Sequence, residues 1–219
     1  MYKLSVDELH KKYGDHEVLK GVSLKAKAGD VISIIGSSGS GKSTFLRCIN
    51  FLEQPCAGTI TVNNEQIRTK QDLNGALRVA DPRQLQKVRT KLAMVFQHFN
   101  LFPHMTVLEN LCLAQKVVRK RGKAEREAKA RALLDKVGIG QKANEYPSRL
   151  SGGQQQRVAI ARALMQQAKV ILADEPIASL DPESARIVMD TLRDINQNDG
   201  ITVVVTLHQV DYALRYCER

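Results

Sequence analysis

The most constraining feature of the sequence is a glycine- and serine-rich loop between an apolar run and a predicted helix. The apolar run Val31–Ile35 predicts a strand, and the helix is expected to begin at Lys42. The loop itself, Gly36–Ser43, fits the phosphate-loop pattern G-x-x-x-x-G-K-[ST]. A glycine-rich surface turn is the alternative, but the strand before the loop and the helix after it match the context that the pattern requires. The sequence therefore predicts an α/β chain with a site for a nucleotide phosphate.

Each residue type in this loop has a distinct role at a phosphate. Glycines let backbone N–H groups curve around the β-phosphate, and the start of the helix adds positive potential. We expect Lys42 to reach the terminal phosphates and Ser43 to bind Mg²⁺. The residues predicted to bind the phosphates of ATP are Gly36, Ser37, Ser38, Gly39, Ser40, Gly41, Lys42, Ser43 and Thr44.

Two carboxylates follow a second apolar run, Val170–Ala173. The run predicts a buried strand, and ligands bind at the carboxyl ends of strands in parallel sheets. At that edge Asp174 is expected to hold Mg²⁺ through water, and Glu175 to polarise the water that attacks the γ-phosphate. Alone, an Asp-Glu pair is typical of an exposed strand end. Together with the phosphate loop, it indicates metal binding and nucleotide hydrolysis.

The rest of the chain alternates between strand and helix patterns, which predicts a mainly parallel sheet. From Tyr2 to about Thr61, short β-rich runs lead into the strand, phosphate loop and helix described above, and Asn63–Pro82 is interpreted as an irregular surface insertion with a turn at Asn74-Gly75. From Val107 to Met165 the pattern is almost entirely helical. The later predicted elements are a strand over Leu92–Phe96, a helix over Pro182–Asn198 whose buried face carries Ile187, Val188, Thr191, Leu192 and Ile195, and a strand over Ile201–Thr206.

Composition limits the class of protein. Lys and Arg total 33 against 23 Asp and Glu, so the formal charge is +10, which favours polyanionic partners such as nucleotides, nucleic acid or a membrane surface. No apolar run reaches the length of a membrane-spanning helix. The four cysteines form no close pair, which fits a reducing cytoplasm.

A third motif connects the sequence to a known family. Leu150–Arg157, which reads LSGGQQQR, is similar to the signature sequence of ABC transporter ATPases and lies shortly before the Asp-Glu strand, as in that family. The remaining family motifs follow in order: Gln97 resembles the glutamine loop, Ser179-Leu180-Asp181 the D-loop, His208 the switch histidine and Tyr13 the aromatic residue that stacks on adenine. The resemblance covers residues 3–217.

The resemblance implies roles for these residues. Glu175, His208 and Gln97 would be catalytic, and Ser43, Gln97 and Asp174 would hold Mg²⁺. Two copies would sandwich two ATP molecules, each bound by the phosphate loop of one chain and the signature of the other. The residues implied to bind nucleotide besides the phosphate loop are Tyr13, Ser151, Gly152, Gly153, Gln154 and Asp181.

The resemblance points to two branches of the family. Residues 1–150 resemble ATPases of importers for histidine, arginine and other polar or basic amino acids, and residues 165–219 resemble the ATPase of phosphonate importers. Amino-acid importers usually carry Thr at the position of Ile177 and Glu at the position of Gln209. We therefore interpret the chain as a mosaic and expect import of a basic or polar amino acid, with phosphonate import as the alternative.

The resemblance also implies an organisation and a set of partners. Residues 1–97 and 161–219 would form a nucleotide-binding core with an antiparallel β subdomain, and residues 98–160 an inserted helical subdomain. The family's final strands would be missing after Arg219. The expected partners are a second ABC ATPase, identical or different, two integral-membrane permease subunits and, indirectly, an external solute-binding protein, at the cytoplasmic face of the plasma membrane.

Two functions other than import are compatible with parts of the sequence. A non-transport ABC ATPase that acts on nucleic acid is supported only by the basic charge. Family members of that kind separate the phosphate loop from the signature with a long coiled coil, and this sequence has no sustained heptads. A regulatory or exporter-type ATPase would share every motif and would differ only in its partner. No nucleic-acid partner is expected.

Overall fold

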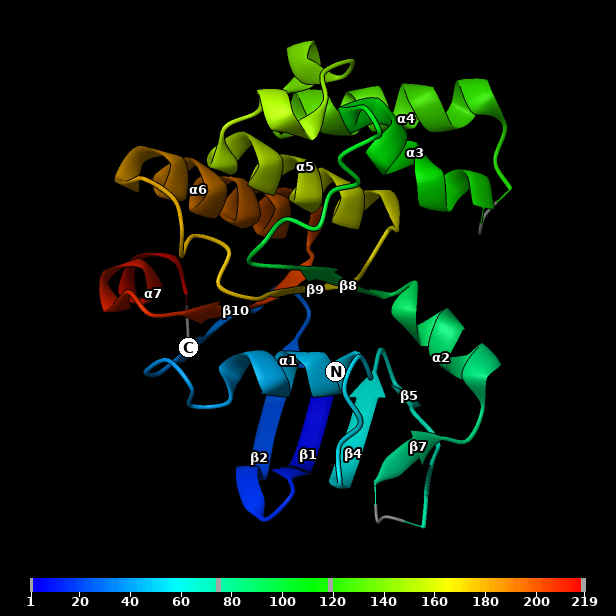
Figure 1. The fold of residues 1–219 in the computed structure, drawn as a ribbon, viewed down its shortest axis with the longest axis vertical. Coiled ribbons are helices and arrows are strands. Elements are labelled where there is room, and N and C mark those ends of the chain that lie inside the picture. The colour runs from blue at the N-terminus through cyan, green and yellow to red at the C-terminus, as the bar shows by residue number, and fades with distance from the viewer. Residues whose placement is uncertain (1, 74–75, 118–119, 218–219) are drawn as a thin grey trace.

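The computed structural model describes residues 2–73, 76–117 and 120–217, which form layers around two main sheets (Figure 1). The strands are β1 (Tyr2–Tyr13), β2 (His16–Lys27), β3 (Val31–Ile35), β4 (Ala57–Val62), β5 (Glu65–Gln66), β6 (Thr69–Gln71), β7 (Leu77–Val79), β8 (Leu92–Val95), β9 (Val170–Ala173) and β10 (Thr202–Leu207). The helices are α1 (Lys42–Ile49), α2 (Pro82–Arg89), α3 (Val107–Val117), α4 (Lys123–Lys136), α5 (Gly152–Met165), α6 (Pro182–Asp199) and α7 (Val210–Tyr216), with 3₁₀ turns η1 (Gly140–Lys142) and η2 (Pro147–Arg149).

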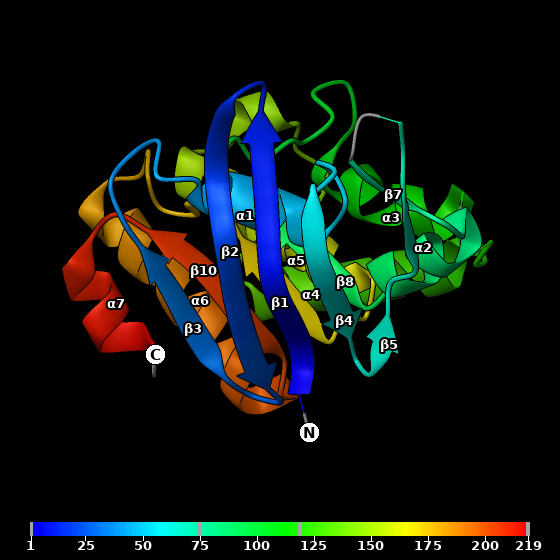
Figure 2. The ribbon, with the colours of Figure 1, turned by 90° about the horizontal axis from the view of Figure 1, so that it is seen from below.

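The N-terminal part of the chain forms an antiparallel sheet with strand order β2-β1-β4-β5, seen from below in Figure 2. Its first two strands are long rather than the short runs that we predicted. Strand β1 contains a bulge, where Glu8 has a left-handed φ of 50° and the register shifts between Val6 and Leu9. The extra residue keeps Leu4, Val6 and Leu9 all fully buried on one face, which an unbroken alternation would not allow.

The second sheet is parallel throughout, with strand order β3-β10-β9-β8. The predicted strand Val170–Ala173 is confirmed with the same bounds, and the last strand begins and ends one residue later than predicted. Every residue of β9 and β10 is buried, as expected for strands covered on both faces. The carboxyl ends of the strands lie at one edge of this sheet.

The helices cover the parallel sheet from two sides (Figure 1). Helix α1 lies between the sheets, and its Phe45, Leu46 and Ile49 belong to the hydrophobic core shared with the antiparallel sheet. Helices α5 and α6 cover the opposite face and belong to a second core that also includes buried residues of α3 and α4. The predicted α/β fold with a mainly parallel sheet, an N-terminal antiparallel sheet and a helical insertion is confirmed.

Three details differ from the sequence prediction. The segment 63–82 contains the short strands β5, β6 and β7 rather than only irregular backbone, and the predicted turn at Asn74-Gly75 lies outside the described residues. The segment 107–165 divides into α3, α4, two 3₁₀ turns and α5; Gly138, at φ 71°, follows the end of α4. On α6 the predicted Ile187 and Thr191 are only partly buried. The buried face instead carries Ala185, Val188, Met189, Leu192, Ile195 and Asn196.

No helix in the described part of the chain is long and apolar enough to cross a membrane.

Candidate active site

The phosphate loop lies at the carboxyl edge of the parallel sheet, between β3 and α1. Two of its glycines have left-handed backbone, Gly39 at φ 79° and Gly41 at φ 91°. A Cβ on Gly41 would also lie 2.9 Å from Val18 Cγ1, and one on Gly36 would lie 2.8 Å from Ser40 Oγ. The left-handed backbone favours glycine at positions 39 and 41, and a side chain at position 41 would also displace Val18 of β2.

Lys42 occupies the first turn of α1 and is 6% exposed. Its Nζ donates hydrogen bonds of 2.9 Å to the carbonyls of Gly36 and Ser37, and it lies 3.7 Å from Glu175 Oε1. These contacts place the ammonium group on the inner side of the loop, where it can meet an incoming phosphate.

The hydroxyl of Ser43 donates to Asp174 Oδ1 over 2.7 Å, so a residue of the phosphate loop meets one that follows β9. Asp174 is 2% exposed, and its backbone N–H donates to the carbonyl of Val95 in the neighbouring strand. Within the described residues no group of three or more His, Cys, Asp or Glu side chains could hold a metal ion. A hydroxyl, one carboxylate and the phosphates of a nucleotide form the type of oxygen donor set that Mg²⁺ prefers. The residues present therefore fit Mg²⁺ together with a nucleotide.

Glu175 follows directly and has a left-handed φ of 45°, which is strained for a non-glycine residue. Its backbone N–H donates to Thr206 Oγ1 over 2.8 Å. Its Oε1 lies 2.6 Å from His208 Nε2. Two of the three predicted catalytic residues thus contact each other directly beside Lys42.

Two other predicted residues lie further from this contact. Gln97 begins the loop after β8, and the pairing of Val95 with Ala173 places it at the same sheet edge as Glu175. Tyr13 lies at the end of β1, is 48% exposed, donates its hydroxyl hydrogen bond to Glu53 and has the Lys11 ammonium 4.8 Å from its ring centre. The ring of Tyr13 is therefore open on the surface rather than packed in the core.

The signature residues form the start of α5. The Ser151 hydroxyl accepts from the Gln154 N–H over 3.3 Å, and the Gln154 side chain accepts from the Ser151 N–H over 3.0 Å, a reciprocal capping box. A Cβ on Gly153 would lie 2.8 Å from Ser184 Cβ, so α5 approaches α6 closely here. Asp181 caps α6, and the hydrogen bonds from the side chain and N–H of Ser184 lower the pKa of its carboxyl. Ser151 itself is exposed.

Within the described residues no hydrogen bond or ion pair joins Ser151, Gly152 or Gly153 to the phosphate loop. Helices α1 and α5 belong to opposite faces of the parallel sheet. One chain thus brings together Lys42, Ser43, Asp174, Glu175 and His208. The signature of the same chain makes no hydrogen bond or ion pair with its phosphate loop in the described part of the structure.

Comparison with known proteins identifies the family to which this site belongs. Residues 19–178 match the family model of the ABC transporter. The chain belongs to this family. It is therefore an ATP-binding cassette and an ATPase, as the motifs predicted.

Relatives from both predicted branches match nearly the whole ABC chain. The histidine transport ATP-binding protein HisP of Pseudomonas aeruginosa is 55% identical over 97% of this chain and 84% of its own length. The phosphonates import ATP-binding protein PhnC of Escherichia coli O157:H7 is 50% identical over 99% of this chain and 83% of its own. A dimeric structure of the ATP-binding cassette MJ0796 in a post-hydrolysis state with ADP and Pi has a TM-score of 0.81 and 38% identity, covering 98% of this chain and 91% of that one. The predicted resemblance to amino-acid and phosphonate importer ATPases is confirmed.

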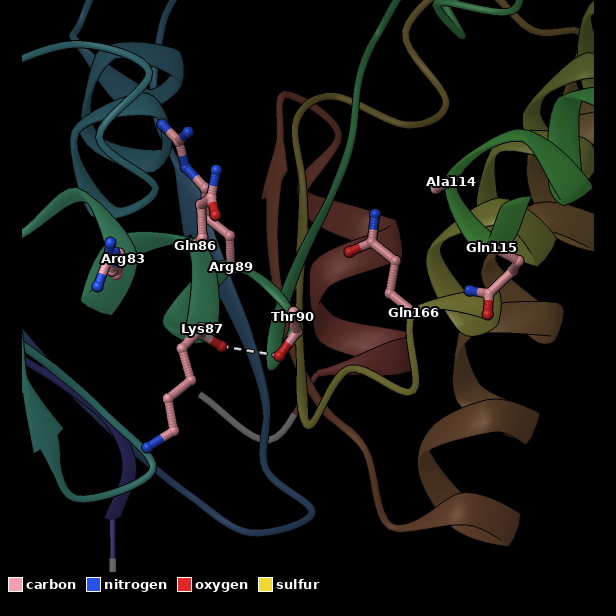
Figure 3. Close-up of a pocket in the computed structure, with 8 residues that line it drawn as sticks. All are labelled: Arg83, Gln86, Lys87, Arg89, Thr90, Ala114, Gln115 and Gln166. Carbon is pink, nitrogen blue, oxygen red and sulfur yellow. Dashed lines mark hydrogen bonds between the residues drawn. The ribbon is translucent and has the colours of Figure 1, made fainter. Parts of the chain in front are cut away.

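A cavity of about 590 Å³ lies elsewhere in this ABC cassette, between α2 and the ends of α3 and α5 (Figure 3). Arg83, Lys87 and Arg89 line one side, and Gln115 and Gln166 lie on the other. Gln115 is 2% exposed; its amide donates to the Met165 carbonyl over 2.6 Å, and its Oε1 has no hydrogen-bond partner. None of the predicted nucleotide-site residues lines this cavity.

Sequence reasoning missed two side chains that contact predicted site segments. Thr206 bonds to Asp174 and Glu175, and Arg162 bonds to the loop after Gln97. The only sequence signal for Thr206 was a hydroxyl residue at the carboxyl end of a predicted strand, which is common in surface strands. Arg162 had no signal outside a helical pattern.

Proposed function

We propose that the chain is the ATP-hydrolysing subunit of an importer for basic or polar amino acids. The observation that carries the hydrolytic part is the Glu175 carboxylate, 2.6 Å from His208 and 3.7 Å from Lys42 beside the phosphate loop. The names and identities of HisP and other amino-acid transport relatives support the cargo class. Import of phosphonates is the second candidate, because PhnC is 50% identical over nearly the same length.

In this proposal the loop residues Gly36–Thr44 bind the phosphates of ATP, and Tyr13 stacks on the adenine. Glu175 acts as general base and accepts the proton of the attacking water, while His208 orients the carboxylate through the contact at Oε1. Lys42 exchanges its loop-carbonyl and carboxylate contacts for the terminal phosphates. These groups bring nucleophile and phosphate into line without a covalent intermediate.

Ser43, Asp174 and Gln97 would hold Mg²⁺. When bound, the ion neutralises charge on the β- and γ-phosphate oxygens. The hydrogen bond between Ser43 and Asp174 keeps the two oxygen donors together, which supports this assignment.

The signature residues Ser151–Gln154 and Asp181 complete the site of a second copy. The exposure of Ser151 at the start of α5 and of Asp181 at the start of α6 supports this assignment, since within the described residues no hydrogen bond or ion pair joins the signature to its own phosphate loop. The partner cassette would be identical or closely related, and the pair would sit on two permease subunits at the cytoplasmic face of the membrane, supplied with cargo by an external binding protein. No nucleic-acid partner is proposed.

The permease surface is proposed within residues 97–146, in the helical subdomain 98–160 and its junction with the core. Ala114 and Gln115 of this segment line the cavity in Figure 3. The basic side chains of Arg83, Lys87 and Arg89 on the opposite side of this cavity support docking of an acidic segment there.

Reconstitution with permeases tests the proposed function. The chain is combined in liposomes with a permease pair for basic amino acids and, separately, with a phosphonate permease pair, and Mg²⁺-dependent ATP hydrolysis is measured with the matching binding protein. We expect the amino-acid pair to stimulate turnover, because a mismatched partner leaves buried polar groups unpaired at about 1–3 kcal/mol each. Liposomes that contain the permease pair without this chain, and the chain with empty liposomes, are the controls. Stimulation by the phosphonate pair alone would transfer the proposal to the second candidate.

A further inference from the structure

A buried hydroxyl lies directly behind the proposed active site. Thr206 is the penultimate residue of β10 and is fully buried. Strand β10 lies between β3 and β9 in the parallel sheet, so the side chain of Thr206 is enclosed by the centre of the fold. Threonine in such an apolar strand requires partners for its hydroxyl group.

The hydroxyl finds those partners on both carboxylate residues. Thr206 Oγ1 accepts the backbone N–H of Glu175 over 2.8 Å. The same oxygen lies 3.2 Å from Asp174 Oδ1 and 3.5 Å from the Ala173 carbonyl. Since a hydroxyl has one proton, it is donated to the nearer and charged acceptor, Asp174 Oδ1. That oxygen also accepts from Ser43, so it is held from two sides.

The backbone explains why a side chain is needed here. The β9–β10 pairing ends at Ala173 and Val205, and the chain then turns through the left-handed φ of Glu175. Beyond the pairing the N–H of Glu175 bonds to the Thr206 side chain in place of a strand carbonyl. The end of β10 thus contacts Glu175 twice, at its backbone through Thr206 and at its carboxylate through His208.

We infer that Thr206 is a positioning residue for ATP hydrolysis: its hydroxyl fixes the strained backbone of Glu175 and the metal-facing carboxylate of Asp174 in one arrangement. The inference rests on the proposed roles of these two carboxylates. It adds a residue that touches neither nucleotide nor metal and acts through both acids. The same strand end therefore orients the base and the Mg²⁺ ligand together.

The strand also supplies a matched control. Thr202 lies at the opposite end of β10, is fully buried, and makes the same type of bonds: it donates to the Lys27 carbonyl over 2.8 Å and accepts from the Gly29 N–H over 3.3 Å. Among the described residues its hydroxyl bonds to the end of β2 and the turn before β3, at the opposite end of β10 from Thr206. Thr202→Val and Thr206→Val therefore remove equivalent hydroxyls from one strand.

The test compares the parent with Thr206→Val, Thr206→Ser and Thr202→Val. We expect Thr206→Val to lower kcat by about tenfold or more, the rate equivalent of one lost interaction of about 1.4 kcal/mol, with KM for ATP within about twofold. Thr206→Ser restores kcat, because serine keeps the hydroxyl. A second readout needs no turnover: Mn²⁺ is titrated with a non-hydrolysable ATP analogue and followed by electron paramagnetic resonance, where Thr206→Val weakens Mn²⁺ binding several-fold and Thr202→Val does not.

Thermal unfolding of the same variants separates folding from positioning. Both valine variants are expected to unfold at similar, lowered temperatures, whereas only Thr206→Val changes kcat and Mn²⁺ affinity. Equal kcat and Mn²⁺ affinity in the two valine variants would overturn the inference. A parent chain that binds the ATP analogue with Mn²⁺ but never hydrolyses Mg²⁺-ATP would instead contradict the proposed function.

Discussion

At the scale of single residues, the proposed hydrolysis depends on the position of the Glu175 carboxylate and on the backbone conformation of Glu175. Its carboxylate contacts His208 and Lys42, and its backbone adopts a conformation that costs about 1–2 kcal/mol for a non-glycine residue. Packing and hydrogen bonds of the neighbouring strands must compensate for that cost. Strain of this kind is retained where it aims a functional side chain.

The base assignment predicts a specific failure when Glu175 is replaced by Gln. The amide keeps the shape of the side chain but cannot accept the proton of water, so turnover falls by about 100-fold or more. ATP binding is retained, because the phosphate loop is untouched. Turnover and binding of a fluorescent ATP analogue measure the two effects. Glu183→Gln, at an exposed position in the first turn of α6, is the matched control and keeps the parent rate; hydrolysis near the parent rate by Glu175→Gln would refute the assignment.

The sequence predicts part of this residue-scale picture. The loop Gly36–Ser43 carries its own pattern, because phosphate binding depends on consecutive backbone groups. Catalytic roles for Glu175 and His208 were expected only through family resemblance, and their direct contact was not predicted. The bond from Glu175 to Thr206 spans 31 residues of sequence and depends on strand order and register, which no local pattern contains.

At the scale of elements, helix α5 connects the signature to the loop after Gln97. Arg162 on this helix donates to the carbonyls of Asn100 over 2.6 Å and Phe99 over 3.1 Å. Both loop residues have left-handed backbone, with φ of 50° and 59°. Burial lowers the pKa of the Arg162 guanidinium, and its two carbonyl partners compensate for the lost water. We therefore expect a movement of α5 to act on the loop after Gln97 through these two hydrogen bonds.

This link predicts that Arg162→Lys uncouples the loop from the helix. A lysine ammonium cannot reproduce the planar fork of two N–H groups, so the loop gains freedom and kcat falls several-fold. Arg157→Lys is the matched control: Arg157 also lies on α5 and donates to two consecutive carbonyls, at Val137 and Gly138, away from the glutamine loop. Steady-state kinetics at saturating Mg²⁺-ATP measures both. Equal effects of the two variants would remove the proposed link.

The helices and strands were predicted best where the hydrophobic pattern of the sequence was unambiguous. The strand β9 matches its prediction because an uninterrupted apolar run can only be buried on both faces. The bulge at Glu8 and the short strands in segment 63–82 were missed, since a left-handed residue and brief pairings depend on tertiary neighbours. On α6 the buried face is rotated relative to the prediction, because contact with α5 at Gly153 and Ser184 sets its orientation.

At the scale of the whole molecule, the layers separate the two halves of the proposed composite site. Helix α1, with Lys42, and helix α5, with Ser151 at its start, belong to different hydrophobic cores on opposite faces of the parallel sheet (Figure 1). Each chain therefore offers one phosphate loop and one signature that begins at the exposed Ser151. We propose that two chains complete each other's sites around ATP.

The measurement that tests this claim most directly is ATP retention by mixed dimers. One chain carries Lys42→Ala, the other Ser151→Arg, and both carry Glu175→Gln so that bound ATP is not consumed. In a mixed dimer both lesions fall in one composite site and the other stays intact, because each site takes its loop from one chain and its signature from the other. Native mass spectrometry with ATP is predicted to find dimers that hold one ATP in the mixture. It is predicted to find no ATP-bound dimers for the Lys42→Ala chain alone or the Ser151→Arg chain alone, and dimers with two ATP molecules for the chain that carries only Glu175→Gln. A mixture that forms no ATP-bound dimers, while Glu175→Gln alone does, would contradict the shared site.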